Sequence, residues 1–176
     1  LRKLLLETFL SQTNEFQEKF SAFSKELVNV CADNFGISLN LLSSHDTRRL
    51  MSQPNSSIKK MKMLWTLLFF LPGVPCIYYG EEIAMEGGKD PDNRRCFPWG
   101  SFLSEERNDF FRYMKELIDW RKKEKTLQYG RLEVVSEADN LRLRRIYAGK
   151  YTEMTIQLSK IGSDFTYSYT KTAKTC

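Results

Sequence analysis

Two short apolar runs on either side of a helix-length segment set the strongest limit on the fold of this chain. ISLNLL (37–42) and VPCIYY (74–79) each have the length of a strand and are largely apolar. Between them, residues 58–71 are apolar on all sides in their second half, which predicts a buried helix that ends at Pro72. A strand, a helix and a strand within about 40 residues form a parallel βαβ unit. The continuous apolar character predicts strands that are covered on both faces.

Helical patterns flank this unit on both sides. Residues 1–12 are helical in pattern, and a second helix with a phenylalanine-rich stripe is predicted from an N-cap at Asn14 to the sequence Asn34-Phe35-Gly36. A further helix is predicted from a capping serine, Ser104, to about Lys125, with acidic residues in its first turn and basic residues in its last. The long connection between the second strand and this helix carries many polar residues, and connections of that length tend to be functional.

After this helix the hydrophobic period changes to two. The segments LQYGRLEVV, LRLRRIY, MTIQLS and FTYSYT alternate apolar and polar residues and are separated by turn-forming sequences. They predict a small antiparallel β module with one solvated face. We therefore expect two domains, at residues 1–126 and 127–176.

Composition and charge exclude several classes of protein. The net charge is +5 over 176 residues, but the basic residues are interleaved with acidic ones, so we expect no nucleic-acid partner. The run 63–79 is shorter than the roughly 20 residues that a membrane span needs and is broken by prolines, so it predicts a core segment. The four cysteines have no CxxC spacing, which argues against a zinc site and favours a reducing, cytoplasmic setting. Cys76, inside an apolar run, is predicted to be a buried thiol.

Polar residues follow both predicted strands. His45, the only histidine, and Asp46 come after the first strand, and Asp90 and Arg94 lie in the connection after the second. Ligands in parallel α/β folds meet the carboxyl ends of the strands, so these four side chains are expected to gather at one mouth. Two simpler interpretations stay open: a turn-forming His-Asp step, and a local ion pair between Asp90 and Arg94.

Taken in order, LNLLSSHDT, LPGVPCIYYGEEIAM and DPDNRRCFPW resemble the alpha-amylase family of glycoside hydrolases, in its neopullulanase, cyclomaltodextrinase and maltogenic amylase branch. The resemblance implies an α/β fold class: the C-terminal portion of a (β/α)8 TIM barrel followed by a small antiparallel β domain. It also implies an α-glucan oligosaccharide substrate, such as a cyclodextrin, pullulan or a maltooligosaccharide.

The resemblance assigns a role to each candidate residue. His45 is similar to the histidine that hydrogen-bonds the sugar at the cleavage point, and Asp46 to the carboxylate that stabilises the oxocarbenium-like transition state. Asp90 and Arg94 resemble a pair that contacts neighbouring glucose units. Two positions depart from the family pattern in a polar group, since Ser43 and Glu81 stand where aspartates are common.

A retaining glycosidase also needs a nucleophilic and an acid/base carboxylate, and in this family both lie on earlier barrel strands. We find neither motif here, so the chain is expected to be part of a hydrolase that is inactive alone and needs the rest of the barrel and an N-terminal domain as partners. Isolated, it should expose unpaired strand edges. No cofactor is expected to be required, and calcium binding stays open. Two alternatives are a non-catalytic amylase-like interaction protein and a carbohydrate-binding module.

Overall fold

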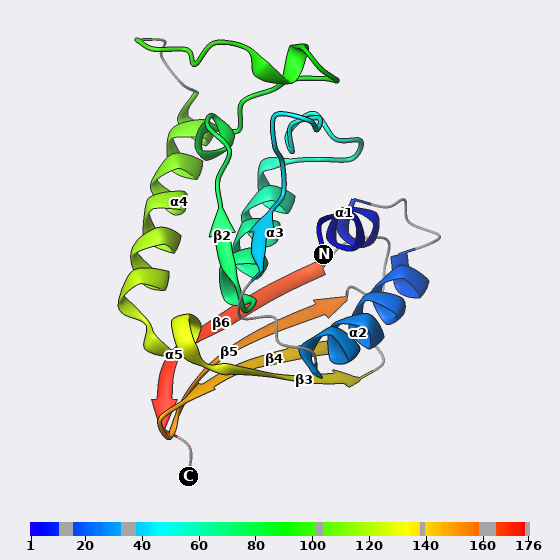
Figure 1. The fold of residues 1–176 in the computed structure, drawn as a ribbon, viewed down its shortest axis with the longest axis vertical. Coiled ribbons are helices and arrows are strands. Elements are labelled where there is room, and N and C mark those ends of the chain that lie inside the picture. Colours follow the sequence, from blue (N-terminus) through cyan, green and yellow to red (C-terminus); the bar gives the residue numbers. More distant parts are fainter. Residues whose placement is uncertain (11–15, 33–37, 101–103, 138–139, 159–164, 175–176) are drawn as a thin grey trace.

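Helices and a parallel strand pair lie above a four-stranded antiparallel sheet (Figure 1). This computed structural model describes residues 1–10, 16–32, 38–100, 104–137, 140–158 and 165–174 of the 176. The helices are α1 (Arg2–Phe9), α2 (Phe16–Ala32), α3 (Ile58–Phe70), α4 (Glu105–Lys123) and α5 (Lys125–Tyr129), with 3-10 turns η2 (Glu81–Ile83) and η3 (Asp92–Arg94). The strands are β1 (Leu39–Leu41), β2 (Val74–Cys76), β3 (Arg131–Glu137), β4 (Asn140–Tyr147), β5 (Lys150–Leu158) and β6 (Phe165–Lys174).

The predicted βαβ unit is confirmed. β1 pairs with β2 in parallel, with Leu41 opposite Cys76, and α3 connects them. The hydroxyl of Ser57 accepts a hydrogen bond from the Lys60 amide at 3.3 Å and so caps the start of α3. The helix ends where Leu71, the residue before proline, turns to an extended ψ of 153°. Both strands are shorter than the apolar runs that predicted them.

The expectation that these strands are covered on both faces is wrong. Leu39 is 62% exposed and Val74 is 57% exposed. Within the described residues β1 and β2 pair only with each other, so each keeps one open edge. The thiol of Cys76 is half-buried and not fully enclosed as predicted, because it lies on this thinly covered strand.

The helices α1 and α2 pack through aromatic side chains. Phe20, Phe23 and Leu27 are buried, as the phenylalanine stripe predicted. The ring of Phe9 meets Phe23 edge-on at a centroid distance of 5.3 Å and Phe165 of β6 at 5.7 Å. These contacts make one continuous core between the helices and the sheet. The predicted caps at Asn14 and at Asn34-Phe35-Gly36 lie outside the described residues.

α4 follows the prediction closely and lies along one side of the molecule (Figure 1). The Ser104 hydroxyl accepts from the Arg107 amide at 3.3 Å, and Phe110, Met114 and Leu117 turn inward. The guanidinium of Arg121 donates to the carbonyl oxygens of the segment 69–73, at 2.6 to 3.0 Å. It thereby satisfies carbonyls at the carboxyl end of α3 that have no partner within that helix.

The sheet is a meander in the order β3-β4-β5-β6, antiparallel throughout, and alternate residues of β4 and β5 are buried. The predicted module with one solvated face is therefore confirmed, except at its start. Residues 127–129 were expected to form a strand but belong to α5, in which the Gly130 amide donates to the Thr126 carbonyl at 2.8 Å. The predicted domain boundary at 126–127 falls inside this short helix and stays a prediction.

Candidate functional site

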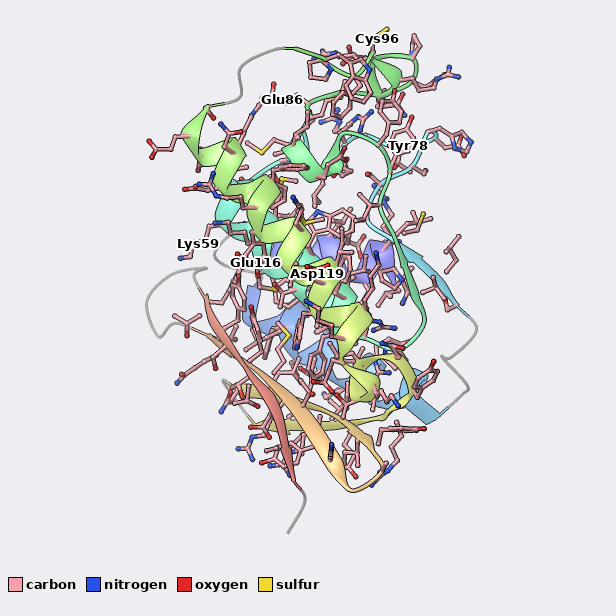
Figure 2. All side chains as sticks on the ribbon, turned by 90° about the vertical axis from the view of Figure 1, so that its left-hand side faces the viewer. Lys59, Tyr78, Glu86, Cys96, Glu116 and Asp119 are labelled. Carbon is pink, nitrogen blue, oxygen red and sulfur yellow. The ribbon has the colours of Figure 1, made fainter. Side chains whose placement is uncertain are left out.

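The loops after β1 and β2 leave the same edge of the strand pair, because the two strands are parallel and in register. Figure 1 shows both loops at the end of the molecule opposite the antiparallel sheet. Figure 2 labels Tyr78, Glu86 and Cys96 at this same end. The topology thus brings the two polar segments singled out in the sequence to one end of the fold.

His45 and Asp46 lie on a tight turn directly after β1. The Nε2 atom of His45 is 3.2 Å from Oδ2 of Asp46, and the two side chains are 68% and 76% exposed. The Ser44 amide donates to Oγ1 of Thr47 at 2.9 Å, and the Thr47 amide donates back to the Ser44 carbonyl at 3.2 Å. The turn therefore presents an imidazole and a carboxylate to solvent side by side.

Asp90 and Arg94 form an ion pair across the η3 turn. Their closest atoms, Oδ1 and Nη2, are 2.5 Å apart, and both side chains are about half exposed. Next to them Arg95 holds Asp92 through two hydrogen bonds of 2.7 and 3.0 Å. The bond to Arg95, together with the amide of Gly88, lowers the pKa of Asp92. This loop therefore carries two carboxylates and two guanidiniums that are paired locally and open to solvent.

Asn93 connects the two loops. Its side chain is fully buried although the residues on both sides of it are exposed. Its Nδ2 atom donates to the carbonyl oxygens of His45 at 2.5 Å and Thr47 at 3.1 Å, and lies 3.5 Å from that of Ser44. The connection between the two sequence-predicted pairs thus runs through a residue that the sequence did not single out.

Arg49 reinforces this connection through its own hydrogen bonds to main-chain carbonyls of the second loop. Its Nε donates to the main-chain carbonyl of Asn93 at 2.9 Å, and Nη1 donates to the carbonyl of Tyr79. The guanidinium carbon lies 4.5 Å from the ring centroid of Tyr78 and 4.6 Å from that of Tyr79. Stacking of a buried guanidinium on aromatic faces is favourable. Arg49 therefore fixes the segment that follows β2 to the η3 turn.

Glu81 is the only acidic side chain among the described residues that is fully buried. Its Oε1 lies 3.9 Å from Nη1 of Arg49 and accepts from the Leu50 amide at 3.3 Å. Burial raises the pKa of this carboxyl, and the nearby hydroxyl of Ser43, the Leu50 amide and Arg49 oppose that rise. The two positions that depart from the family pattern, 43 and 81, are thus neighbours in space, one in the segment after β1 and the other in the segment after β2. The sequence analysis identified both positions as departures from the family pattern but did not predict that they are close in space.

No group of three or more His, Cys, Asp or Glu side chains is arranged to hold a metal ion in the part of the chain that the structure describes. Across the same residues, none of the helices has the length and apolar character that crossing a membrane requires.

Comparison with known proteins now decides the family. The model of the protein family described as "Alpha amylase, catalytic domain" matches residues 6–102, which is more than half of the chain. The chain belongs to the alpha-amylase family. It is 36% identical over 123 residues to an intracellular maltogenic amylase of Bacillus subtilis, an alignment that covers 70% of this chain and 21% of that protein. It is 33% identical over 139 residues to a cyclomaltodextrinase of a Bacillus species, with 78% and 24% covered.

Solved structures of the family agree with the fold. A cyclomaltodextrinase superposes with a TM-score of 0.72 at 28% identity, covering 90% of this chain and 27% of that one. An alpha-amylase from Geobacillus thermoleovorans, complexed with acarbose, gives 0.69 at 26% identity, covering 88% and 34%. The expected fold, a part of a (β/α)8 barrel with a small antiparallel sheet, is confirmed. This alpha-amylase family chain spans about a fifth to a quarter of the length of the two curated relatives.

Proposed function

We propose that this chain forms one wall of the substrate cleft of a retaining glycoside hydrolase that cleaves α-1,4-glucosidic bonds, with α-1,6 bonds as a second candidate linkage. The substrates would be cyclodextrins, pullulan or maltooligosaccharides. The names of the relatives support this class, since they include a cyclomaltodextrinase and an amylopullulanase from Thermoanaerobacter thermohydrosulfuricus. The observation that carries the proposal is the presentation of His45-Asp46 and Asp90-Arg94 on two loops at one end of the fold, joined by Asn93.

The exposed groups match the chemistry of a sugar ring. Asp46 would stabilise the positive charge that develops on the ring in the transition state. His45 would donate to a hydroxyl of the same ring. Asp90 and Arg94 offer acceptors and donors for the hydroxyls of a neighbouring glucose unit. Each of these side chains is at least half exposed, so a ligand can reach all four.

We also propose that the chain does not hydrolyse glycosides alone. Retaining hydrolysis needs two further carboxylates about 5 Å apart, a nucleophile and an acid/base. Of the nearby acids, Glu81 is closed off from solvent and Asp90 is paired with Arg94. The two missing groups, and the remainder of the barrel and an N-terminal domain, would come from the rest of a full-length protein.

An exposed apolar surface supports the need for such a partner. Beside β2, a cavity of about 620 Å³ is lined by Val74, Pro75, Ile77 and Ile118 among others. Because Leu39 and Val74 are also largely exposed, this surface has the apolar character of a protein interior rather than that of a solvated surface. Neighbouring barrel strands would cover it. We also propose a reducing, cytoplasmic setting, in which the free thiols Cys76 and Cys96 would persist.

A glucan titration tests the proposal. We expect the chain to bind maltotetraose with about millimolar affinity, measured by calorimetry, and Asp90→Ala and Asp46→Asn to weaken this binding. The matched control is Asp119→Ala, because Asp119 also pairs with a basic residue four positions later, Lys123, and is 65% exposed on α4. Figure 2 shows Asp119 well away from Tyr78 and Cys96. Equal binding by all three variants, or none by the wild type, would overturn the proposal.

The alternative of a carbohydrate-binding or interaction protein is favoured by one observation, the exposure of all four site residues in a chain without the catalytic pair. Hydrolysis does not separate the two, because both predict that the chain alone releases no reducing sugar from cyclodextrin. The variant Asp46→Asn separates them, because glucan binding depends on Asp46 in the leading proposal. Binding that depends on Asp90 and is indifferent to Asp46→Asn would favour a binding module.

A further inference from the structure

The side chains of His45 and Asp46 have little to hold them in place. They contact each other at the surface, and contacts between such exposed polar side chains contribute little order or stability. Their direction therefore depends on the backbone of the turn 44–47. Any group that fixes this backbone decides where the imidazole and the carboxylate point.

Asn93 is such a group. Its amide nitrogen faces three carbonyl oxygens of the turn, and an amide nitrogen has two hydrogens to donate. The contacts with His45 and Thr47 are no longer than an ordinary hydrogen bond, so the 3.5 Å contact with Ser44 is the weakest of the three. The position of the Asn93 amide nitrogen requires a hydrogen-bond donor without negative charge. An acceptor there would be repelled by the three carbonyl oxygens that it faces. Asn93 is also sealed from solvent, so water does not replace these bonds.

Asn93 is itself held on its main-chain side. Arg49, two residues after Thr47, returns to donate to the Asn93 carbonyl, and its own amide donates to the Gly87 carbonyl at 3.1 Å. The turn after β1 and the η3 turn are thus tied together twice, once through each residue. Arg94 directly follows Asn93, so the same tie sets the position of the Asp90-Arg94 pair relative to His45.

We propose that Asn93 is a positioning residue for glucan recognition: it holds the His45-Asp46 turn in register with the Asp90-Arg94 pair. The inference rests on the proposed function of those four residues. It predicts that removing the donor at position 93 weakens glucan binding by the folded chain, although Asn93 itself is buried beneath the turn and does not reach the ligand.

The single histidine of the chain gives a direct readout. The ring signal of His45 in a ¹H–¹³C NMR spectrum reports on this turn alone. Asn93→Asp keeps the size of the side chain and replaces the donor by an acceptor. We expect this variant to shift or split the His45 ring signal in the absence of sugar. We also expect it to lower maltotetraose affinity about ten-fold, the factor associated with loss of a buried hydrogen bond.

Two further measurements keep the test decisive. Where Asn93→Asp does not fold, Asn93→Ser retains one donor and should give a smaller change in the same direction. Affinity is referred to the folded fraction, measured by circular dichroism. A merely structural role would lower the folded fraction and leave the affinity of the folded chain and the His45 signal unchanged, and that result would overturn the inference.

Failure of the proposed function gives a different result. If wild-type chain binds no maltotetraose, the proposed glucan role fails, and with it the role of Asn93 in recognition. If wild-type chain binds and loses affinity in Asp90→Ala, yet Asn93→Asp binds equally well with an unchanged His45 signal, the proposed function stands and the positioning role of Asn93 is wrong.

Discussion

The guanidinium of Arg145 on β4 donates to the carbonyl oxygen of Phe70 at 2.7 Å, at the last residue of α3. The same side chain donates to the carbonyl of Gly130 at 2.9 Å and is 1% exposed. One buried cation thus joins the sheet to the carboxyl end of the central helix and to the turn that begins the sheet. Helix carboxyl ends favour cations, so the location is electrostatically suited to an arginine.

Replacement of Arg145 should weaken the attachment of the sheet to the carboxyl end of α3 and so lower the stability of the fold. Arg145→Met keeps the apolar stem and leaves the Phe70 and Gly130 carbonyls buried without this donor. We expect the free energy of unfolding to fall by about 2–4 kcal/mol, measured by urea denaturation. Arg144→Met is the matched control on the opposite face of β4, where the arginine is paired with Glu153 and is 39% exposed. Similar losses in both variants would contradict the assigned role of Arg145.

The buried carboxyl of Glu81 predicts a dependence of stability on pH. Because its pKa is raised in the folded state, the folded chain holds this proton more tightly than the unfolded chain. Its contribution to stability is complete below the ordinary pKa of 4.5 and is lost as pH rises through the higher folded value. The stability of wild type minus that of Glu81→Gln should therefore fall as pH increases above 4.5.

Urea unfolding of both proteins between about pH 4 and pH 8 measures this difference. Glu86→Gln is the control, since Glu86 is 55% exposed in its surface pair with Arg107. A difference between wild type and Glu81→Gln that is flat, or rises with pH, would show that the carboxyl is not destabilised by burial.

The hydroxyl of Tyr113 connects three elements, since it bonds to Thr66 of α3 and lies 3.1 Å from the hydroxyl of Tyr167 on β6. Burial is the main cause that raises its pKa. The folded state therefore keeps the phenol protonated, and its contribution is present below the unfolded value of about 10 and lost above it. Tyr113→Phe should lose about 1 kcal/mol at neutral pH and show a smaller further loss at alkaline pH.

Unfolding curves from about pH 8 to pH 11 measure the alkaline loss in each protein. Tyr129→Phe, which alters a side chain that is 65% exposed, should leave neutral stability unchanged. A wild-type chain that loses no more stability at alkaline pH than Tyr113→Phe would refute the assignment.

Gly87 and Gly88 should differ sharply in their tolerance of a methyl group. A Cβ at Gly87 would lie 2.8 Å from the Asn93 Cα and 2.8 Å from the Asp92 carbonyl oxygen, both backbone atoms. A Cβ at Gly88 would meet the carboxylate of Asp92 at 3.1 Å, and that side chain can turn away. We expect Gly87→Ala to cost about 1–3 kcal/mol, as overpacking does, and to shift the His45 ring signal.

Gly88→Ala is the neighbouring control and should leave both the unfolding curve and the His45 signal close to wild type. Equal effects of the two substitutions would mean that the η3 turn is not packed against Gly87 as described.

Local patterns predicted the elements that local interactions create. Ser57 and Ser104 cap helices that the apolar spacing had located, and the period-two segments form the meander. The error at residues 127–129 has a local cause as well, because alternation over three residues does not distinguish a strand from one helical turn. The exposure of Leu39 and Val74 was not predictable from their apolar character, since it depends on which strands are neighbours.

The sequence predicted the exposed residues of the candidate site but not the buried residue that connects its two loops. His45, Asp46, Asp90 and Arg94 follow strands, which is a rule of topology, and their assignment as glucan contacts stays a prediction. Asn93 was missed because its signal is a set of side-chain bonds to main-chain carbonyls 46 to 49 positions away. Main-chain acceptors are the same at every residue, so such bonds leave no mark on the sequence.

The two sheets differ in how far the chain must travel to close them. In the meander each strand pairs with its successor across a short connection, whereas β1 meets β2 only after the chain has passed through α3. Contacts between residues close in sequence form faster than those that require a large loop to close. We therefore expect the carboxyl-terminal meander to assemble early in refolding. The parallel pair that carries both site loops should form later, because α3 must first form between its two strands.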